Sequence, residues 1–169
     1  MPGSPTEGEG AASVAIAADE YLWFVDLALG QMTAIVEELG DELVNRRPPF
    51  RDANSAYAIV THCLGVMEYW GGATVAERPV QRDRAAEFTA SGDVAGLLRR
   101  CEQARRRLRE DLVGMHAEDP PVNVRRNPDD PAPYTETKGS VLLHVLRELF
   151  QHLGQMELTR DALVASRRR

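Results

Sequence analysis

Three polar side chains share one face of an otherwise apolar segment near the carboxyl end of the sequence. The segment reads His144-Val-Leu-Arg-Glu148-Leu-Phe-Gln-His152, so that a glutamate lies between two histidines. Residues four apart lie on the same side of an α-helix, so Glu148 and His152 can point to a common position, and so can His144 and Glu148. Because such groups are costly to bury alone, they must either bond to one another or hold a metal ion.

A third imidazole can join this pair from an earlier segment. His62 lies near the middle of a second apolar run, and it can face the later segment if both segments are helices of one bundle. Two imidazoles and one carboxylate with open positions suit catalytic zinc and non-haem iron. The spacing is therefore compatible with a divalent metal at His62, Glu148 and His152, and does not by itself select this site. The alternative is a buried polar pair on the last segment, with His62 unrelated to it.

Four amphipathic segments supply the helices that must position these side chains. Apolar residues recur at intervals of three and four from about 13 to 39, 55 to 76, 93 to 112 and 139 to 165, and alternation with a period of two is nearly absent. Asn54 or Ser55 can cap the second helix, and Asp93 the third. Long links follow the second and third helices. The pattern predicts an all-α, single-domain four-helix bundle over residues 13–169 with long crossover loops.

Composition and charge narrow the class of protein. The 169 residues suffice for one domain, and 43% hydrophobic and 27% charged residues are typical of a folded soluble chain. The net charge of -6 disfavours nucleic acid as a partner, and no apolar run is long enough for a membrane span. Cys63 and Cys101 form no disulfide framework, and residues 1–12 are interpreted as a flexible tail without the pattern of a signal peptide. These features predict a cytoplasmic protein.

Three stretches together resemble the DinB-like superfamily of metal-binding four-helix bundles. They are Asn54-Ser55, His62-Cys63-Leu64-Gly65, and Glu148 with His152-Leu-Gly-Gln-Met-Glu-Leu-Thr-Arg-Asp. The resemblance covers roughly residues 21–165 and is closest to the branch of mycothiol-dependent maleylpyruvate isomerase and the related thiol S-transferases. It implies that His62, Glu148 and His152 hold one ion, with zinc as the first choice and nickel or iron as alternatives. His144 aligns with a position that is usually not a ligand.

The resemblance also implies a function, namely a metal-dependent thiol S-transferase. The metal would activate the thiolate of a low-molecular-weight thiol, mycothiol by resemblance, for attack on an electrophilic substrate. Arg82 and Arg84, in the link after the second helix, are candidates to bind carboxylates of this thiol or of the substrate; the alternative is that they are surface arginines.

Two other functions and one assembly stay open at this level. A metal-dependent hydrolase or lyase would use metal-bound water in place of a thiol. A non-enzymatic stress-response binding protein would need no metal, because its polar side chains would satisfy one another. A homodimer through an outer helix face is compatible with the sequence. The loop of residues 118–138 is expected to be an active-site cover or a mobile excursion.

Overall fold

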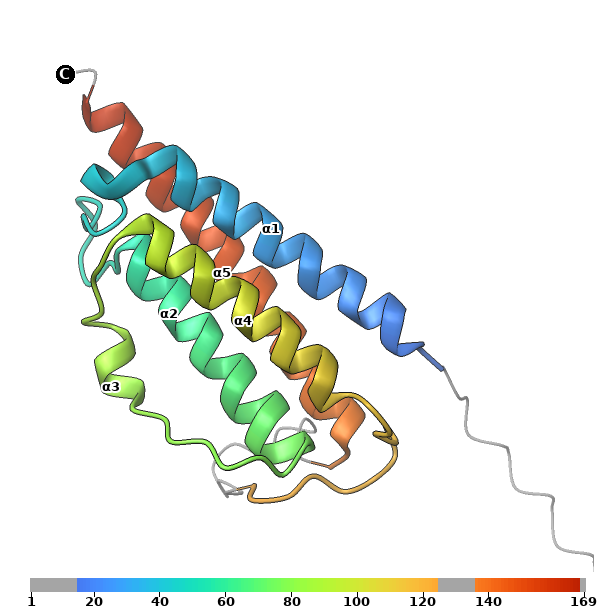
Figure 1. The fold of residues 1–169 in the computed structure, drawn as a ribbon. Coiled ribbons are helices and arrows are strands. Elements are labelled where there is room, and N and C mark those ends of the chain that lie inside the picture. Colours follow the sequence, from blue (N-terminus) through green and yellow to red (C-terminus); the bar gives the residue numbers. More distant parts are fainter. Residues whose placement is uncertain (1–14, 125–135, 168–169) are drawn as a thin grey trace, which may run out of the picture.

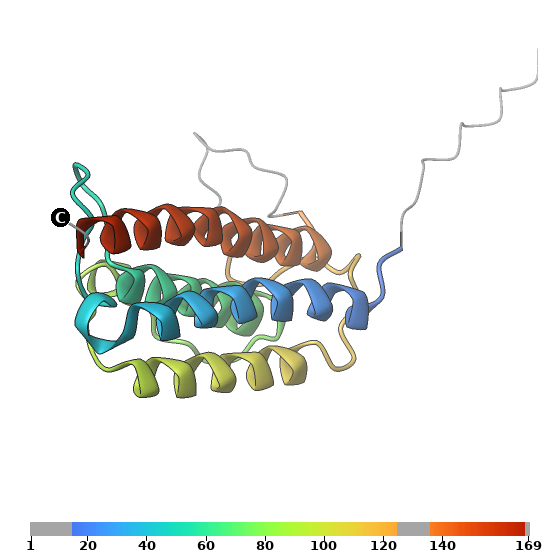
Figure 2. The same ribbon diagram turned by 90° about the horizontal axis from the view of Figure 1, so that it is seen from above.

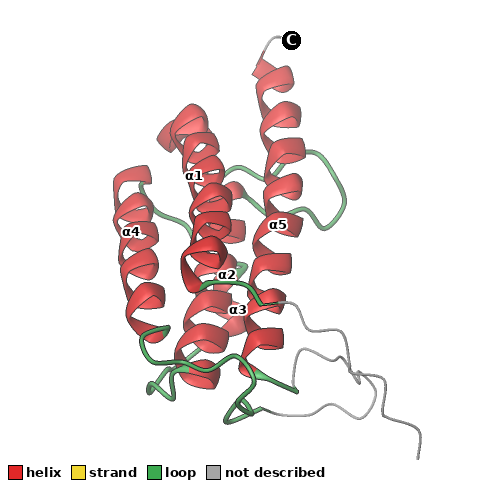
Figure 3. Ribbon diagram, turned by 90° about the vertical axis from the view of Figure 1, so that its right-hand side faces the viewer, coloured by secondary structure: helices red, strands yellow, loops and turns green. Residues whose placement is uncertain are grey.

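The described part of the chain is entirely helical. The computed structural model describes residues 15–124 and 136–167, and within them no strand occurs (Figure 3). The elements are α1 (Ala18–Leu43), α2 (Ala56–Val66), the π-helix η1 (Met67–Val75), α3 (Arg84–Glu87), α4 (Val94–Asp111) and α5 (Lys138–Arg167). The all-α prediction is therefore confirmed. The expected tail, residues 1–12, and the middle of the loop at 118–138 lie outside the described residues.

The long helices form a four-helix bundle in which α2 and η1 make one continuous rod. Helices α1 and α5 run in one direction, and the rod and α4 run in the other (Figure 1). Figure 2 shows α5 and α4 on opposite sides, with α1 and the rod between them. Each of α4 and α5 packs against α1, α2 and η1, whereas no Cα atoms of α4 and α5 in the described residues come within 8 Å of each other. The rod therefore presents one side to α5 and another to α4.

Local sequence signals explain where these helices begin and bend. Ser55 Oγ accepts a hydrogen bond from the Ala58 backbone N–H at 3.2 Å, and Asp93 Oδ1 accepts one from the Gly96 N–H at 2.7 Å. These caps satisfy backbone donors that the first turn of a helix leaves free. Helix α1 bends at Gly40, where φ is +62° and ψ is 179°, close to the predicted end of the first helix.

All four long helical segments of the bundle, α2 and η1 counting as one, contribute to one hydrophobic core. Its largest fully buried side chains include Leu29 and Met32 of α1, Ile59 of α2, Met67 of η1, Leu97 and Leu108 of α4, and Leu149 and Met156 of α5. None of the helices in the described residues combines the length and apolarity that crossing a lipid bilayer requires.

The two links differ in their course. Residues 76–93 run back along the bundle and carry the short helix α3, which packs against α2 (Figure 1). The end of α4 and the start of α5 lie at the same end of the bundle. Because α3 packs against α2, the link of residues 76–93 passes beside this helix. This position matters for the site described next.

Candidate metal centre

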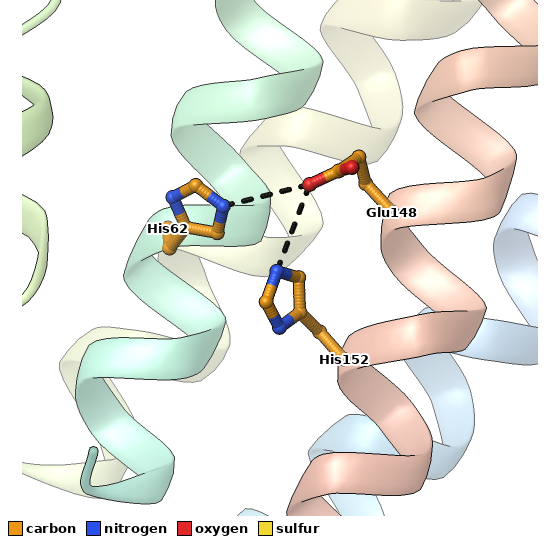
Figure 4. A group of neighbouring side chains, drawn as sticks. All are labelled: His62, Glu148 and His152. Atoms are coloured by element: carbon orange, nitrogen blue, oxygen red, sulfur yellow. Dashed lines mark ion pairs between the residues drawn. The ribbon is translucent and has the colours of Figure 1, made fainter. Parts of the chain in front are cut away.

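The three predicted ligands meet between α2 and α5. His62 extends from α2, and Glu148 and His152 extend from successive turns of α5, with the three side chains pointing toward one another (Figure 4). Glu148 Oε2 lies 3.7 Å from His62 Nε2 and 3.6 Å from His152 Nε2. One potential ligand atom from each residue lies within 4.8 Å of the others. The bundle therefore brings together residues that the sequence separates widely.

The spacing of these atoms suits a divalent ion. Zinc bonds of about 2.0–2.1 Å in a tetrahedral site place neighbouring ligand atoms about 3.3 Å apart. The present separations of 3.6 and 3.7 Å from Glu148 Oε2 exceed that value by a few tenths of an ångström, so small side-chain adjustments would close the site. Two imidazole nitrogens and one carboxylate oxygen leave room for at least one further ligand.

The other ring nitrogen of His62 is already bonded. His62 Nδ1 lies 2.8 Å from Glu87 Oε2, and a carboxylate can only accept, so the Nδ1–H donates this hydrogen bond. The lone pair of His62 is then on Nε2, which faces Glu148 and His152. Phe88 stacks on the same imidazole, with ring centroids 4.8 Å apart and planes 27° apart. His62 is therefore fixed at its edge and on its face by two neighbouring residues of the link.

His152 is oriented in a similar way from within its own helix. Its Nδ1 lies 2.9 Å from Gln155 Oε1, one turn further along α5. The Nδ1–H donates to the amide oxygen, which leaves the Nε2 lone pair directed at Glu148. Both imidazoles thus present Nε2 to the same place.

The electrostatics of the group favour a cation between these side chains. The imidazoles of His152 and His62, when protonated at Nε2, form ion pairs with Glu148 and hold its pKa well below its usual range, although partial burial opposes the shift. The pKa of His152 is raised, chiefly by its interaction with Glu148. Without a metal, an anionic carboxylate therefore attracts a proton to the adjacent imidazole. A metal ion would occupy the same lone pair in place of that proton.

His144 lies outside this group. Arg147 Nη2 is 3.2 Å from His144 Nδ1 and also donates to Glu148 Oε1 at 2.6 Å. The His144 ring packs edge-on against Trp70 of η1, with centroids 5.0 Å apart. In the described chain, the cluster with metal-ligand spacing consists of His62, Glu148 and His152 alone.

The two arginines predicted to bind a thiol or substrate lie beside His62. Arg82 Nε donates to Glu87 Oε1 at 2.7 Å, and Arg82 Nη2 donates to Glu87 Oε2 at 3.0 Å. The guanidinium group of Arg84 lies over the Phe88 ring, 5.5 Å from its centroid. Both arginines are thus close to the candidate ligands, and their contact with a thiol or a substrate stays a prediction.

The sequence pattern of the family described as Mycothiol-S-transferase matches residues 22–165. The chain belongs to the mycothiol S-transferase family. The matched range contains all three candidate ligands and most of the described helical residues, and it confirms the resemblance found from the sequence. The polar cluster between α2 and α5 lies within the range that matches the mycothiol S-transferase family.

A solved structure shares the fold of this family member. The crystal structure described as "the conserved protein of locus from Enterococcus faecalis" aligns with a TM-score of 0.65, covering 90% of this chain and 99% of that one. The sequence identity is 12%, so this likeness establishes the fold alone. No curated protein matches the chain in sequence.

The sequence pattern of this mycothiol S-transferase family member did not single out Glu87, which holds His62 by a hydrogen bond. It belongs to a helix of four residues within a polar link, where no hydrophobic periodicity marks a side chain as buried. The useful signal was indirect. A histidine that binds a metal through one nitrogen needs an acceptor for the other, and an acidic residue close to Arg82 in the link could provide it.

Proposed function

We propose that the protein is a metal-dependent thiol S-transferase that joins the sulfur of a low-molecular-weight thiol to an electrophilic carbon. The observation that carries the proposal is the convergence of His62 Nε2, His152 Nε2 and a Glu148 oxygen between α2 and α5. The family name indicates mycothiol as the thiol. The substrate class is an electrophile small enough to reach a site that side chains of α2 and α5 enclose.

His62, Glu148 and His152 would hold the ion, with zinc as the first choice and nickel or iron compatible with the same donors. When bound, the cation would stabilise a thiolate over a thiol at neutral pH, because a coordinating thiol is deprotonated. In the transfer, the thiol proton leaves to solvent and a sulfur–carbon bond forms. The electron pair of the bond that breaks at that carbon departs with a leaving group or, if the substrate is an activated double bond, stays on the substrate and takes up a proton from solvent.

The surrounding residues prepare the site for this reaction. His62 is buried, whereas the side chains of Glu148 and His152 are 15% and 16% exposed. The site is therefore buried on the His62 side and partly exposed on the α5 side. Arg147 donates to the Glu148 oxygen that does not face the imidazoles. This bond leaves Glu148 Oε2 directed at the two Nε2 atoms.

The first test measures metal content. Wild-type protein purified without a chelator or a histidine tag is expected to contain nearly one divalent ion per chain, and His152→Ala is expected to lose most of it. His116→Ala is the matched control, because His116 is exposed and lies outside the cluster. Equal metal in wild type and His152→Ala would remove the proposed site.

The second test asks whether the open position receives sulfur. In cobalt-substituted protein, a thiolate-to-metal absorption band is expected only after a small thiol is added, since none of the three proposed ligands is a cysteine. Mycothiol should produce the band at far lower concentration than a generic thiol, because specific recognition needs contacts beyond sulfur. If neither thiol binds and a water-dependent reaction persists without them, the protein is a hydrolase instead.

A further inference from the structure

We propose that Glu87 is a positioning residue for the metal ligand His62, and that Arg82 and Gly65 hold Glu87 in place. This inference rests on the proposed metal centre and extends it to the link between η1 and α4. It gives Arg82 a role other than the predicted contact with a thiol.

The carboxylate of Glu87 uses both oxygens inside the protein. The residue is 7% exposed, and its Oε2 accepts the His62 Nδ1–H at 2.8 Å. Arg82 donates two hydrogen bonds to the same carboxylate, from Nε to Oε1 at 2.7 Å and from Nη2 to Oε2 at 3.0 Å. A buried carboxylate is costly without a partner, and the Arg82 guanidinium supplies two charge-assisted hydrogen bonds to it.

Gly65 provides the space for this pair on the surface of α2. A Cβ atom at position 65 would lie 2.0 Å from Glu87 Oε1 and 3.2 Å from Arg82 Nε. Only glycine therefore lets Glu87 approach His62 at this depth. This explains why α2 tolerates a residue that costs about 1 kcal/mol relative to alanine in a helix interior.

The arrangement has a definite chemical effect. A carboxylate that accepts from the second ring nitrogen fixes the tautomer and orientation of an imidazole ligand and raises its basicity. Removing such a partner commonly lowers metal affinity about 10- to 100-fold. His152 instead donates to the neutral amide of Gln155, so the two imidazoles are supported unequally and His62 is the one held by a charged group.

The main experiment measures zinc affinity by competition with a chromophoric chelator. Glu87→Gln removes the charge, and Gly65→Ala displaces an unchanged Glu87; each is expected to weaken zinc binding about 10- to 100-fold. Gly154→Ala is the matched control, because a Cβ there meets no other group within 4 Å. It should bind zinc like the wild type. If both test variants also bind like the wild type, this inference is wrong while the metal centre stands; if the wild type binds no metal, the proposed function itself fails.

A second readout separates positioning from a general loss of stability. In zinc-bound protein, the His62 Nδ1–H proton should resonate far downfield and exchange slowly with water in the wild type and in Gly154→Ala, because Glu87 accepts it. The signal should move upfield and exchange faster in Glu87→Gln and Gly65→Ala. Variants that melt earlier but keep the wild-type His62 Nδ1–H signal and zinc affinity would show that Glu87 only stabilises the fold.

Arg82→Gln distinguishes the two roles of Arg82. If Arg82 holds Glu87, zinc affinity should fall, and the His62 Nδ1–H signal of zinc-bound protein should move upfield with it. If the variant keeps wild-type zinc affinity and loses only affinity for an added thiol, Arg82 is a thiol contact and its assignment to Glu87 is overturned.

Discussion

Two adjacent residues of α2 show how one position along a helix separates reactive from inert chemistry. His62 directs Nε2 toward α5, whereas the next residue, Cys63, is fully buried in the core. Burial, assisted by the negative charges of Glu148 and Glu87, raises the pKa of the Cys63 thiol far above its ordinary value. Burial also raises the pKa of Cys101 to about 11. Neither cysteine is therefore a thiolate near neutral pH.

We predict that neither cysteine reacts with a disulfide-exchange reagent in the folded protein at about pH 8, because the thiolate is the reacting species. Both should react as soon as the chain is unfolded in denaturant, and the colour released in each state measures this directly. Fast release of one equivalent from native protein would contradict the prediction. A Cys63→Ser variant should also leave the cobalt–thiol band unchanged, which shows that its sulfur comes from the added thiol.

At the level of the helix, the same substitution is expected to have opposite effects at two glycines. Gly40 adopts φ +62° and ψ 179° at the bend of α1, a conformation that is essentially restricted to glycine, so Gly40→Ala should cost about 1–3 kcal/mol. Gly154 lies in regular α5 with space for a Cβ, so Gly154→Ala should stabilise the protein by up to about 1 kcal/mol.

Chemical denaturation of the two variants measures both free energies of unfolding. Neither position has an atom within 4 Å of the added Cβ, so a difference between them reports the backbone rather than a clash. Equal effects at the two glycines would show that the backbone at Gly40 is not strained.

The long helices and two of their caps were predictable because they depend on local signals. Ser55 and Asp93 are cap residues by type, and α5 follows the regular spacing of its apolar side chains. The π-helix η1 was not predictable, since its form depends on packing. A Cβ at Gly71 would lie 2.7 Å from Leu108 Cδ1 of α4. That contact exists only after the helices have assembled.

The candidate site shows the same difference between features that local sequence signals predict and features that depend on packing. His62, Glu148 and His152 lie on helices whose faces follow from periodicity, and the structure places them together. Glu87 reaches His62 from a link whose path no local pattern specifies. Which acidic residue of the link would be buried depends on how that link crosses α2.

For the whole molecule, we predict that metal is not required for folding. The core contains aliphatic side chains of α1, α2, α4 and α5, and a chain of this size can bury enough apolar surface to fold without a metal. Chelation should leave the far-ultraviolet helical signal intact. It should lower the melting temperature, because a ligand present at a hundred times its Kd stabilises by about 2.7 kcal/mol, or roughly 5–10 °C for a chain of this length. Loss of helicity at room temperature would show that the ion is structural.

The diagonal placement of α4 and α5 determines which parts of the protein an ion can hold closed. An ion bound to His62 and His152 ties α2 to α5, and those two helices cannot separate until it leaves. Among the described residues, helix α4 supplies none of the proposed ligands, and its backbone does not come within 8 Å of that of α5, Cα to Cα. Amide hydrogens of α2 and α5 should therefore exchange with deuterium more slowly once metal is bound, while those of α4 keep nearly the same rate wherever they exchange by local opening. Metal binding would then suppress local opening of α2 and α5 and leave local opening of α4 unchanged.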